Sequence, residues 1–354
     1  MEFGGLLRYT YLLVAARSFS ALEASVTTVR SFTGAAETAV PDEIIHVPGK
    51  EGRNVTVHAY LNEVAKKAKV EGRPCVTYIT LHGTTPFDPG ILLMLTSRIG
   101  GGFVLRRHGR DAGFIKHLLQ SAVLAPIPLI ILDSDYPHAP EYPFPAAIED
   151  ISSLVAYIRS RPDLYDPTKL LLGGFSAGAN IALGVSTYLG ERAINAGEPH
   201  PIQGIVAFYP PVNMTGSRRY ENVERVQPRR TIHRVILPKN MGDFIHACYF
   251  NPSPDPGEDK RKPYASPALA DVGTFPSKVL LITCEYDGLQ ASSEKFRAKL
   301  KTEGDGRIDV RGRCIEGVGH GWDGMITKEG VPGWKERVEA YDEAVKLVRD
   351  VAAN

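Results

Sequence analysis

The chain has 354 residues, of which 43% are hydrophobic and 23% are charged, and these values are typical of a globular protein. Its 41 basic and 40 acidic residues give a formal net charge of +1, which argues against a nucleic-acid-binding protein. The apolar run at residues 9–16 is too short for a stable membrane span and weak as a signal peptide. A cytoplasmic protein with an amphipathic first helix is therefore expected, with secretion or association with a membrane surface as the alternatives.

The four cysteines indicate neither a metal site nor a redox site, because none of them belongs to a C-x-x-C pair. We expect reduced thiols that serve as small apolar groups, and no metal or cofactor. The cysteines are Cys75, Cys248, Cys284 and Cys314. Six arginines between residues 218 and 234 are expected on a solvated face, with contact to an anionic substrate as the alternative.

The first predicted elements are helices and loops within residues 1–40, which we interpret as the N-terminal part of a cap. Residues 44–47 and 55–60 alternate apolar and polar side chains and predict an antiparallel pair of strands. Short apolar runs then recur and predict strands that are buried on both faces of a parallel sheet. These runs are residues 76–81, 127–132, 170–172, 205–208 and 279–282.

Helical patterns separate the apolar runs, for example at residues 148–158, and residues 338–348 place apolar side chains on one helical stripe. This alternation predicts an α/β fold with a mostly parallel twisted sheet flanked by helices. Residues 211–265 are polar and rich in proline, and they predict an inserted cap. The main domain is then expected to comprise residues 41–210 and 266–354.

A candidate nucleophile, Ser176, lies in the sequence Gly174-Phe175-Ser176-Ala177-Gly178. This G-x-S-x-G pattern follows a predicted strand and precedes a helix-prone stretch. A serine on such a turn is exposed at the carboxyl end of a sheet, and the flanking glycines permit close packing of strand and helix. The alternative interpretation is a glycine-rich turn that arose by chance.

A serine hydroxyl needs a neighbouring base, and the base needs an acid that orients it. Asp287 follows the predicted strand at residues 279–284, and His320 follows a strand-like run at residues 310–315. The order serine, acid, histidine is the one that G-x-S-x-G hydrolases use. Glu285 is the competing acid, and Asp287 could instead cap a helix that starts near Ala291.

Several segments resemble those of hormone-sensitive-lipase-type carboxylesterases of the α/β-hydrolase superfamily. Residues 135–141 and 144–150 are similar to the family's DYRLAPE…FPAA.ED segment, residues 173–180 to its GGDSAGGN motif, and residues 264–267 to its cap-exit segment. The resemblance spans roughly residues 40–350. It implies an α/β-hydrolase fold with a mainly helical cap and favours Asp287 over Glu285 as the acid. Phe175 departs from the family, which has aspartate before the serine.

An oxyanion hole requires backbone N–H donors, one of which we expect from Ala177. The family's HGGGF loop is split here, because His82-Gly83 is separated from Gly101-Gly102-Phe103 by the anomalous insertion Thr84–Gly100. The other donors are therefore expected from Gly83 and Thr84, or from Gly101 and Gly102. The codons that these residues permit are compatible with a translated, unspliced intron that keeps the reading frame. The alternative is a genuine surface loop whose ends lie close together.

The expected activity is hydrolysis of carboxylic esters with small to medium acyl chains, through an acyl-enzyme formed on Ser176. A lactonase or acyltransferase with the same three residues stays open, as does a non-catalytic small-molecule receptor on this fold. His320 argues against the receptor, while the split loop argues for it. The expected partner is a small ester substrate, and the sequence is compatible with a homodimer.

Overall fold

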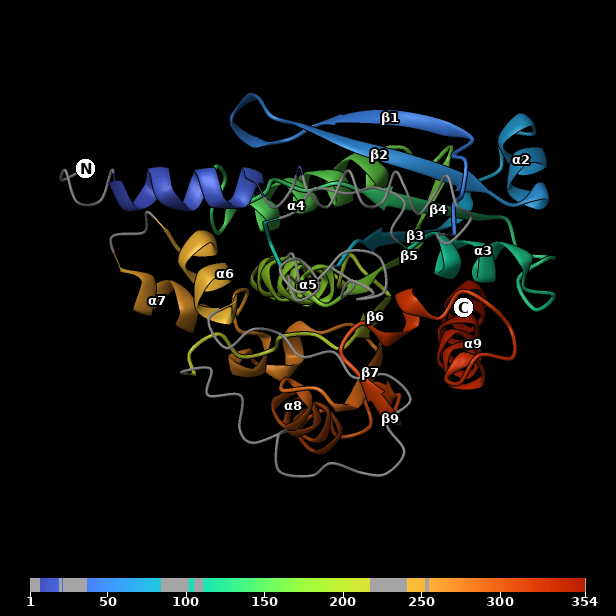
Figure 1. Ribbon diagram of the computed structural model, residues 1–354. Helices are drawn as coiled ribbons and strands as arrows, with labels where there is room; N and C mark the ends of the chain where they lie inside the picture. Colours follow the sequence, from blue (N-terminus) through green and yellow to red (C-terminus); the bar gives the residue numbers. More distant parts are fainter. Residues whose placement is uncertain are drawn as a thin grey trace.

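A computed structural model describes residues 7–18, 21, 37–83, 102–104, 111–216, 241–251 and 255–353. It contains a nine-stranded sheet in the order β1-β2-β4-β3-β5-β6-β7-β8, with β9 also pairing with β7 (Figure 1). The strands are β1 (Glu43–Pro48), β2 (Asn54–Leu61), β3 (Cys75–Leu81), β4 (Leu129–Ser134), β5 (Tyr165–Phe175), β6 (Gly204–Phe208), β7 (Lys278–Tyr286), β8 (Asp309–Arg311) and β9 (Cys314–Gly319). Strand β2 pairs antiparallel with β1 and β4, and the other pairs are parallel. The predicted mostly parallel α/β sheet is confirmed.

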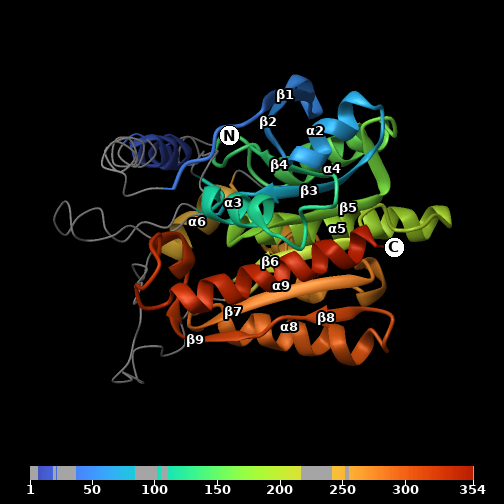
Figure 2. The same ribbon diagram turned by 90° about the vertical axis from the view of Figure 1, so that its right-hand side faces the viewer.

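Helices cover both faces of the sheet, with α3 and α9 on one face and α4, α5 and α8 on the other (Figures 1 and 2). The α-helices are α2 (Glu63–Val70), α3 (Ala112–Gln120), α4 (Ala146–Arg159), α5 (Ala177–Ala196), α6 (Met241–Tyr249), α7 (Pro256–Arg261), α8 (Gln290–Glu303) and α9 (Trp334–Ala352). Each face of the sheet has its own apolar core. Because both faces are covered, every residue of β3 is buried, and continuous apolar runs are the sequence pattern of such strands.

One predicted strand is wrong in its extent, because the run at residues 310–315 forms two short strands, β8 and β9. The break occurs at Gly312, whose φ is 101°. A Cβ atom at this position would lie 2.1 Å from the carbonyl oxygen of Leu281 on β7. The left-handed backbone and this close approach interrupt the pairing with β7, which resumes at Cys314 opposite Thr283.

The segment between β6 and β7 contributes α6 and α7, which lie near the helix at residues 7–18 at one end of the sheet (Figures 1 and 2). Aromatic contacts join α6 to the rest of the molecule. The ring of Tyr249 stacks on Phe103 with centroids 3.7 Å apart and also contacts Phe144. The predicted basic cluster at residues 218–234 and the insertion at residues 84–100 lie outside the described residues.

A membrane-crossing helix is absent from the described part of the chain, since none of its helices combines the length and the apolar character that a bilayer requires.

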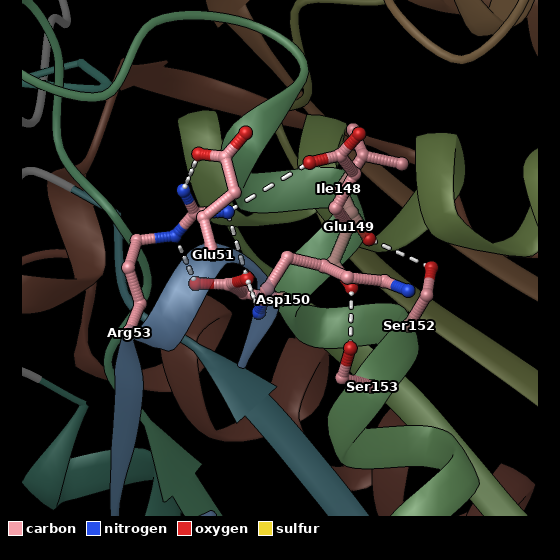
Figure 3. A network of polar contacts seen from close by, with 8 residues as sticks. Glu51, Arg53, Ile148, Glu149, Asp150, Ser152 and Ser153 are labelled. Carbon is pink, nitrogen blue, oxygen red and sulfur yellow. Dashed lines mark hydrogen bonds and ion pairs between the residues drawn. The ribbon is translucent and has the colours of Figure 1, made fainter. Parts of the chain in front are cut away.

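A buried ion pair joins the turn between β1 and β2 to α4 (Figure 3). Arg53 donates from Nε to Asp150 Oδ2 at 2.8 Å and from Nη2 to Asp150 Oδ1 at 3.0 Å. The backbone N–H of Lys50 also donates to this carboxylate, at 2.7 Å. The hydrogen bond with Asp150 raises the pKa of Arg53, which therefore keeps its charge. Asp150 itself is almost fully buried.

Replacing Asp150 by alanine is expected to lower the free energy of unfolding by about 3–5 kcal/mol, because it leaves a largely buried guanidinium without its buried carboxylate partner. Urea denaturation measures this loss. Glu51→Ala is the matched control, since Glu51 contacts the same guanidinium at 2.7 Å but is 80% exposed. Its removal is expected to cost less than about 1 kcal/mol. Equal losses in the two variants would contradict the importance of the buried pair.

Candidate active site

Ser176 occupies the sharp turn between β5 and α5. Its φ of 50° and ψ of −115° lie outside the regions that non-glycine residues favour. Gly174 and Gly178 flank the turn, and a Cβ atom on either would lie within 2.3 Å of the carbonyl oxygen of Leu81 on β3. The glycines are therefore required by the close packing of this turn against the neighbouring strand. The strained turn leaves the side chain of Ser176 directed towards His320.

Three side chains that are far apart in the sequence form one hydrogen-bonded line. Ser176 Oγ lies 2.8 Å from His320 Nε2, and His320 Nδ1 lies 2.7 Å from Asp287 Oδ2. All three side chains are buried. A carboxylate beside Nδ1 favours the tautomer with the proton on Nδ1, which leaves Nε2 free to accept the serine proton. The geometry therefore suits activation of a serine nucleophile.

The structure separates the two candidate acids. Asp287 follows β7 and accepts a hydrogen bond from the N–H of Leu289 at 3.0 Å, in addition to its contact with His320. Glu285 accepts a hydrogen bond from the N–H of Gly317 at 2.8 Å and so ties β7 to β9. Helix α8 begins at Gln290 with Leu289 in the capping position and no side-chain cap. Asp287 therefore contacts the histidine, and Glu285 does not take its place.

Tyr209 packs on His320 and is itself held by Asp323, and the sequence patterns revealed neither residue. The ring of Tyr209 meets the imidazole edge to face, with centroids 4.8 Å apart. Its hydroxyl donates to Asp323 Oδ1 at 2.6 Å, and Tyr341 donates to Asp323 Oδ2 at 2.8 Å. Burial, followed by the charge of Asp323, raises the pKa of both tyrosines well above the ordinary value. Both hydroxyls therefore stay protonated and remain donors.

Tyr209→Phe is expected to lower the free energy of unfolding by about 2 kcal/mol, since Asp323 then loses one of two donors to a buried charge. The phenylalanine ring still packs on His320, so kcat for an ester is expected to fall less than tenfold. Urea denaturation and steady-state kinetics measure the two effects. Tyr341→Phe is the control, because it removes the equivalent bond without a ring contact to His320. An unchanged free energy of unfolding in both variants would contradict this account.

The candidate oxyanion donors are only partly within the described residues. A Cβ atom on Gly83 would lie 2.2 Å from the carbonyl oxygen of Phe175, so Gly83 packs directly against the residue before the serine. Ala177 is the first residue of α5 and is buried. Gly102 has a φ of 46° and packs against Ile245 of α6. Thr84 and Gly101 lie outside the described residues.

The cysteines occupy apolar surroundings. Cys75, Cys248 and Cys284 are fully buried, and Cys314 is half-buried. Burial raises the pKa of each thiol, to about 12 in the case of Cys248. The thiols are therefore protonated at neutral pH and poor nucleophiles. None of them takes part in the line formed by Ser176, His320 and Asp287.

Residues 99–323 match the model of a family described as having the alpha/beta hydrolase fold. The carboxylic ester hydrolase LipN of Mycobacterium tuberculosis is 27% identical over 51% of this chain and 46% of its own length. Arylacetamide deacetylase-like 2 of Homo sapiens is 26% identical over 49% of this chain and 44% of its own length. The chain thus spans less than half the length of these two relatives. Probable carboxylesterase 6 of Arabidopsis thaliana is 26% identical over 75% of this chain and 70% of its own length.

Solved structures show the same architecture. An esterase of Pyrobaculum calidifontis is 25% identical and superposes with a TM-score of 0.69, covering 97% of this chain and 94% of its own. The carboxylesterase EstE1 from a metagenomic library is 24% identical, with a TM-score of 0.69 and coverage of 96% and 97%. This likeness confirms the fold that the motifs predict. Because the family match covers residues 99–323, the chain belongs to the hormone-sensitive-lipase-type family with the α/β-hydrolase fold.

Proposed function

We propose that this protein is a serine esterase that cleaves carboxylic esters with small to medium acyl chains. The observation that carries the proposal is the hydrogen-bonded line from Ser176 through His320 to Asp287. The names of the relatives support it, since they include a carboxylic ester hydrolase and carboxylesterases. The expected receptor alternative is less favoured, because a receptor has no need of a buried acid and base aligned on a strained serine.

The proposed reaction begins when Ser176 Oγ attacks the acyl carbon while His320 Nε2 accepts the serine proton. Asp287 holds the imidazole in the required tautomer and stabilises its charged form. The tetrahedral intermediate collapses and expels the alkoxide, which takes the proton from His320. Water then attacks the acyl-enzyme with the help of the same imidazole, which releases the carboxylic acid and restores Ser176.

The negative oxygen of the intermediate requires donors close to Ser176, and losing one such donor costs on the order of 3 kcal/mol. The backbone N–H of Ala177, at the start of α5, is the first proposed donor. Gly83 is a second, because its backbone packs against Phe175 beside the serine. Thr84, Gly101 and Gly102 remain candidates for the third.

A chain-length series of p-nitrophenyl esters, from acetate to dodecanoate, tests the proposed activity. A rapid release of p-nitrophenol equal to the enzyme concentration, followed by slower turnover, is the expected sign of an acyl-enzyme. Product analysis in the presence of an added alcohol separates hydrolysis from acyl transfer. A lactone assayed under the same conditions tests the lactonase alternative. Absence of any release from all esters would overturn the proposal in favour of the receptor.

We also propose that Thr84–Gly100 is foreign to the family pattern. The family match begins at residue 99, at the end of this insertion, although β3, which precedes the insertion, belongs to the same sheet as the strands of the matched part. Gly102-Phe103-Val104 resumes the family's loop sequence, and Phe103 is buried against Tyr249. Sequencing of mature transcripts decides between a translated intron and a genuine loop. Every transcript would encode a genuine loop, whereas spliced transcripts would lack a translated intron.

Deleting Thr84–Gly100 joins Gly83 to Gly101 and restores His-Gly-Gly-Gly-Phe. We expect the deletion variant to have a higher kcat/KM for p-nitrophenyl acetate, by about a hundredfold, because small displacements of groups at a reaction centre have effects of this size. The full chain, purified and assayed in parallel, is the control. An equal or lower kcat/KM in a folded deletion variant would show that the insertion leaves the oxyanion donors in place.

A further inference from the structure

Two histidines and one aspartate meet at the carboxyl ends of two neighbouring strands. His82 follows β3, whereas Asp135 and His138 follow β4, and β3 and β4 are paired in parallel up to Leu81 and Ser134. One nitrogen from each histidine and one carboxylate oxygen lie within 4.8 Å of one another. We propose that these three side chains bind a single Zn²⁺ ion, next to Gly83 but separate from Ser176.

The carboxylate oxygen of Asp135 lies at a similar distance from one nitrogen of each histidine. Asp135 Oδ1 lies 3.4 Å from His82 Nε2 and 3.7 Å from His138 Nδ1. The first contact is a long hydrogen bond, and both distances exceed the most common N–H···O distances of about 2.7–3.2 Å. Ligands of tetrahedral zinc, with metal–ligand bonds of about 2.0–2.1 Å, are about 3.4 Å apart. The carboxylate is therefore already placed relative to both nitrogens as an ion would require.

The two imidazoles are held in position by the ring of Tyr136. Its centroid lies 4.7 Å from that of His82 and 4.6 Å from that of His138, and all three rings are stacked. The hydroxyl of Tyr136 also donates to the carbonyl oxygen of His82 at 3.0 Å. Two histidines fixed by packing lose little conformational entropy when they bind an ion, which favours affinity.

Burial differs across the cluster in a way that suits a three-ligand site. The side chains of His82 and His138 are 1% and 3% exposed, whereas that of Asp135 is 26% exposed. The ion can therefore enter past Asp135, and water can supply the fourth ligand. Two imidazoles and one carboxylate form a donor set that Zn²⁺ prefers in sites with an open position. His138 is a feature of this chain, because the similar family segment DYRLAPE has leucine there.

Titration of the metal-free protein with Co²⁺ tests the site, since tetrahedral Co²⁺ absorbs visible light and Zn²⁺ should displace it. We expect one ion per chain and a higher Tm with Zn²⁺. His138→Leu is expected to weaken binding at least about a hundredfold, because it removes one of three ligands. His117→Gln is the matched control: His117 pairs with Asp342 at 2.8 Å in another part of the molecule, so binding should be unchanged.

The measurement is metal binding, so its outcome does not depend on esterase activity. If His138→Leu is unfolded without metal, Asp135→Asn replaces it in the Co²⁺ titration. Asp135 is partly exposed, and asparagine keeps the shape of its side chain, so this variant is expected to fold. Stoichiometric binding that both folded variants retain would overturn the proposal. Loss of binding in His320→Asn alone would also overturn it and would place the ion at Ser176. Absence of the Co²⁺ spectrum from the unmodified protein would exclude the site.

Discussion

Ser176→Ala is expected to lower kcat for p-nitrophenyl acetate by about 10⁴-fold or more, to the level of a protein that only binds the ester. The reason is chemical: alanine cannot form the acyl-enzyme, whereas His320 and Asp287 stay in place. The rapid initial release of p-nitrophenol should disappear together with turnover. Steady-state and stopped-flow kinetics on the same preparation measure both effects.

The control for this variant is Ser186→Ala, because Ser186 is also buried and lies on the same helix, α5. Its hydroxyl lies 3.4 Å from His200 Nε2, away from the line formed by Ser176 and His320. We expect Ser186→Ala to retain kcat within a factor of about three. Activity that persists in Ser176→Ala while its Tm is unchanged would show that another group performs the reaction.

Asp287→Asn is expected to lower kcat near neutral pH by about 10⁴-fold. The asparagine amide can donate to His320 Nδ1, which stabilises the tautomer with the proton on Nε2. That imidazole cannot accept the proton of Ser176, although the positions of all atoms are nearly preserved. The rates of the unmodified protein and the variant, measured as a function of pH, test this explanation, because a wrong tautomer lowers the rate at every pH at which the imidazole is uncharged.

Glu285→Gln is the matched control, because it makes the same chemical change two residues earlier in the chain. Glu285 receives the N–H of Gly317, and a glutamine oxygen can accept the same bond. We therefore expect kcat to change by less than about threefold. A large loss in Glu285→Gln together with a small loss in Asp287→Asn would reverse the assignment of the acid.

The strands of the parallel sheet and their positions along the chain were predictable, because these strands are buried on both faces. Short continuous apolar runs, such as residues 76–81 and 279–282, are the pattern of such strands and are hard to interpret otherwise where helical segments separate them. The predicted run at residues 127–132 is displaced from β4, which is Leu129–Ser134. Apolar pattern alone does not mark strand ends, because backbone pairing with β2 and β3 extends the strand to polar Asp133 and Ser134.

The supporting residues were not predictable in the same way. Tyr209 and Asp323 are 114 positions apart, and neither belongs to a motif with a recognisable spacing. His82 and His138 do lie in recognised segments, but no pattern in either segment indicates that the two meet, which happens only because β3 and β4 are neighbours. Contacts of this kind depend on which strands pair and how loops pack, and a single sequence gives no local pattern for either.

The sequence by itself determined the chemistry that is available: a serine on a glycine-flanked strand–helix turn, followed by acids and a histidine in a fixed order. Only the tertiary structure shows that Asp287, and not Glu285, contacts His320. The two carboxylates lie on either side of the end of β7, and the pairing of β7 with β9 directs Glu285 to Gly317. Asp287 lies beyond the strand, in the turn that faces the loop of His320. The 2.7 Å contact between Asp287 Oδ2 and His320 Nδ1 therefore depends on how these separate segments pack, which local sequence does not specify.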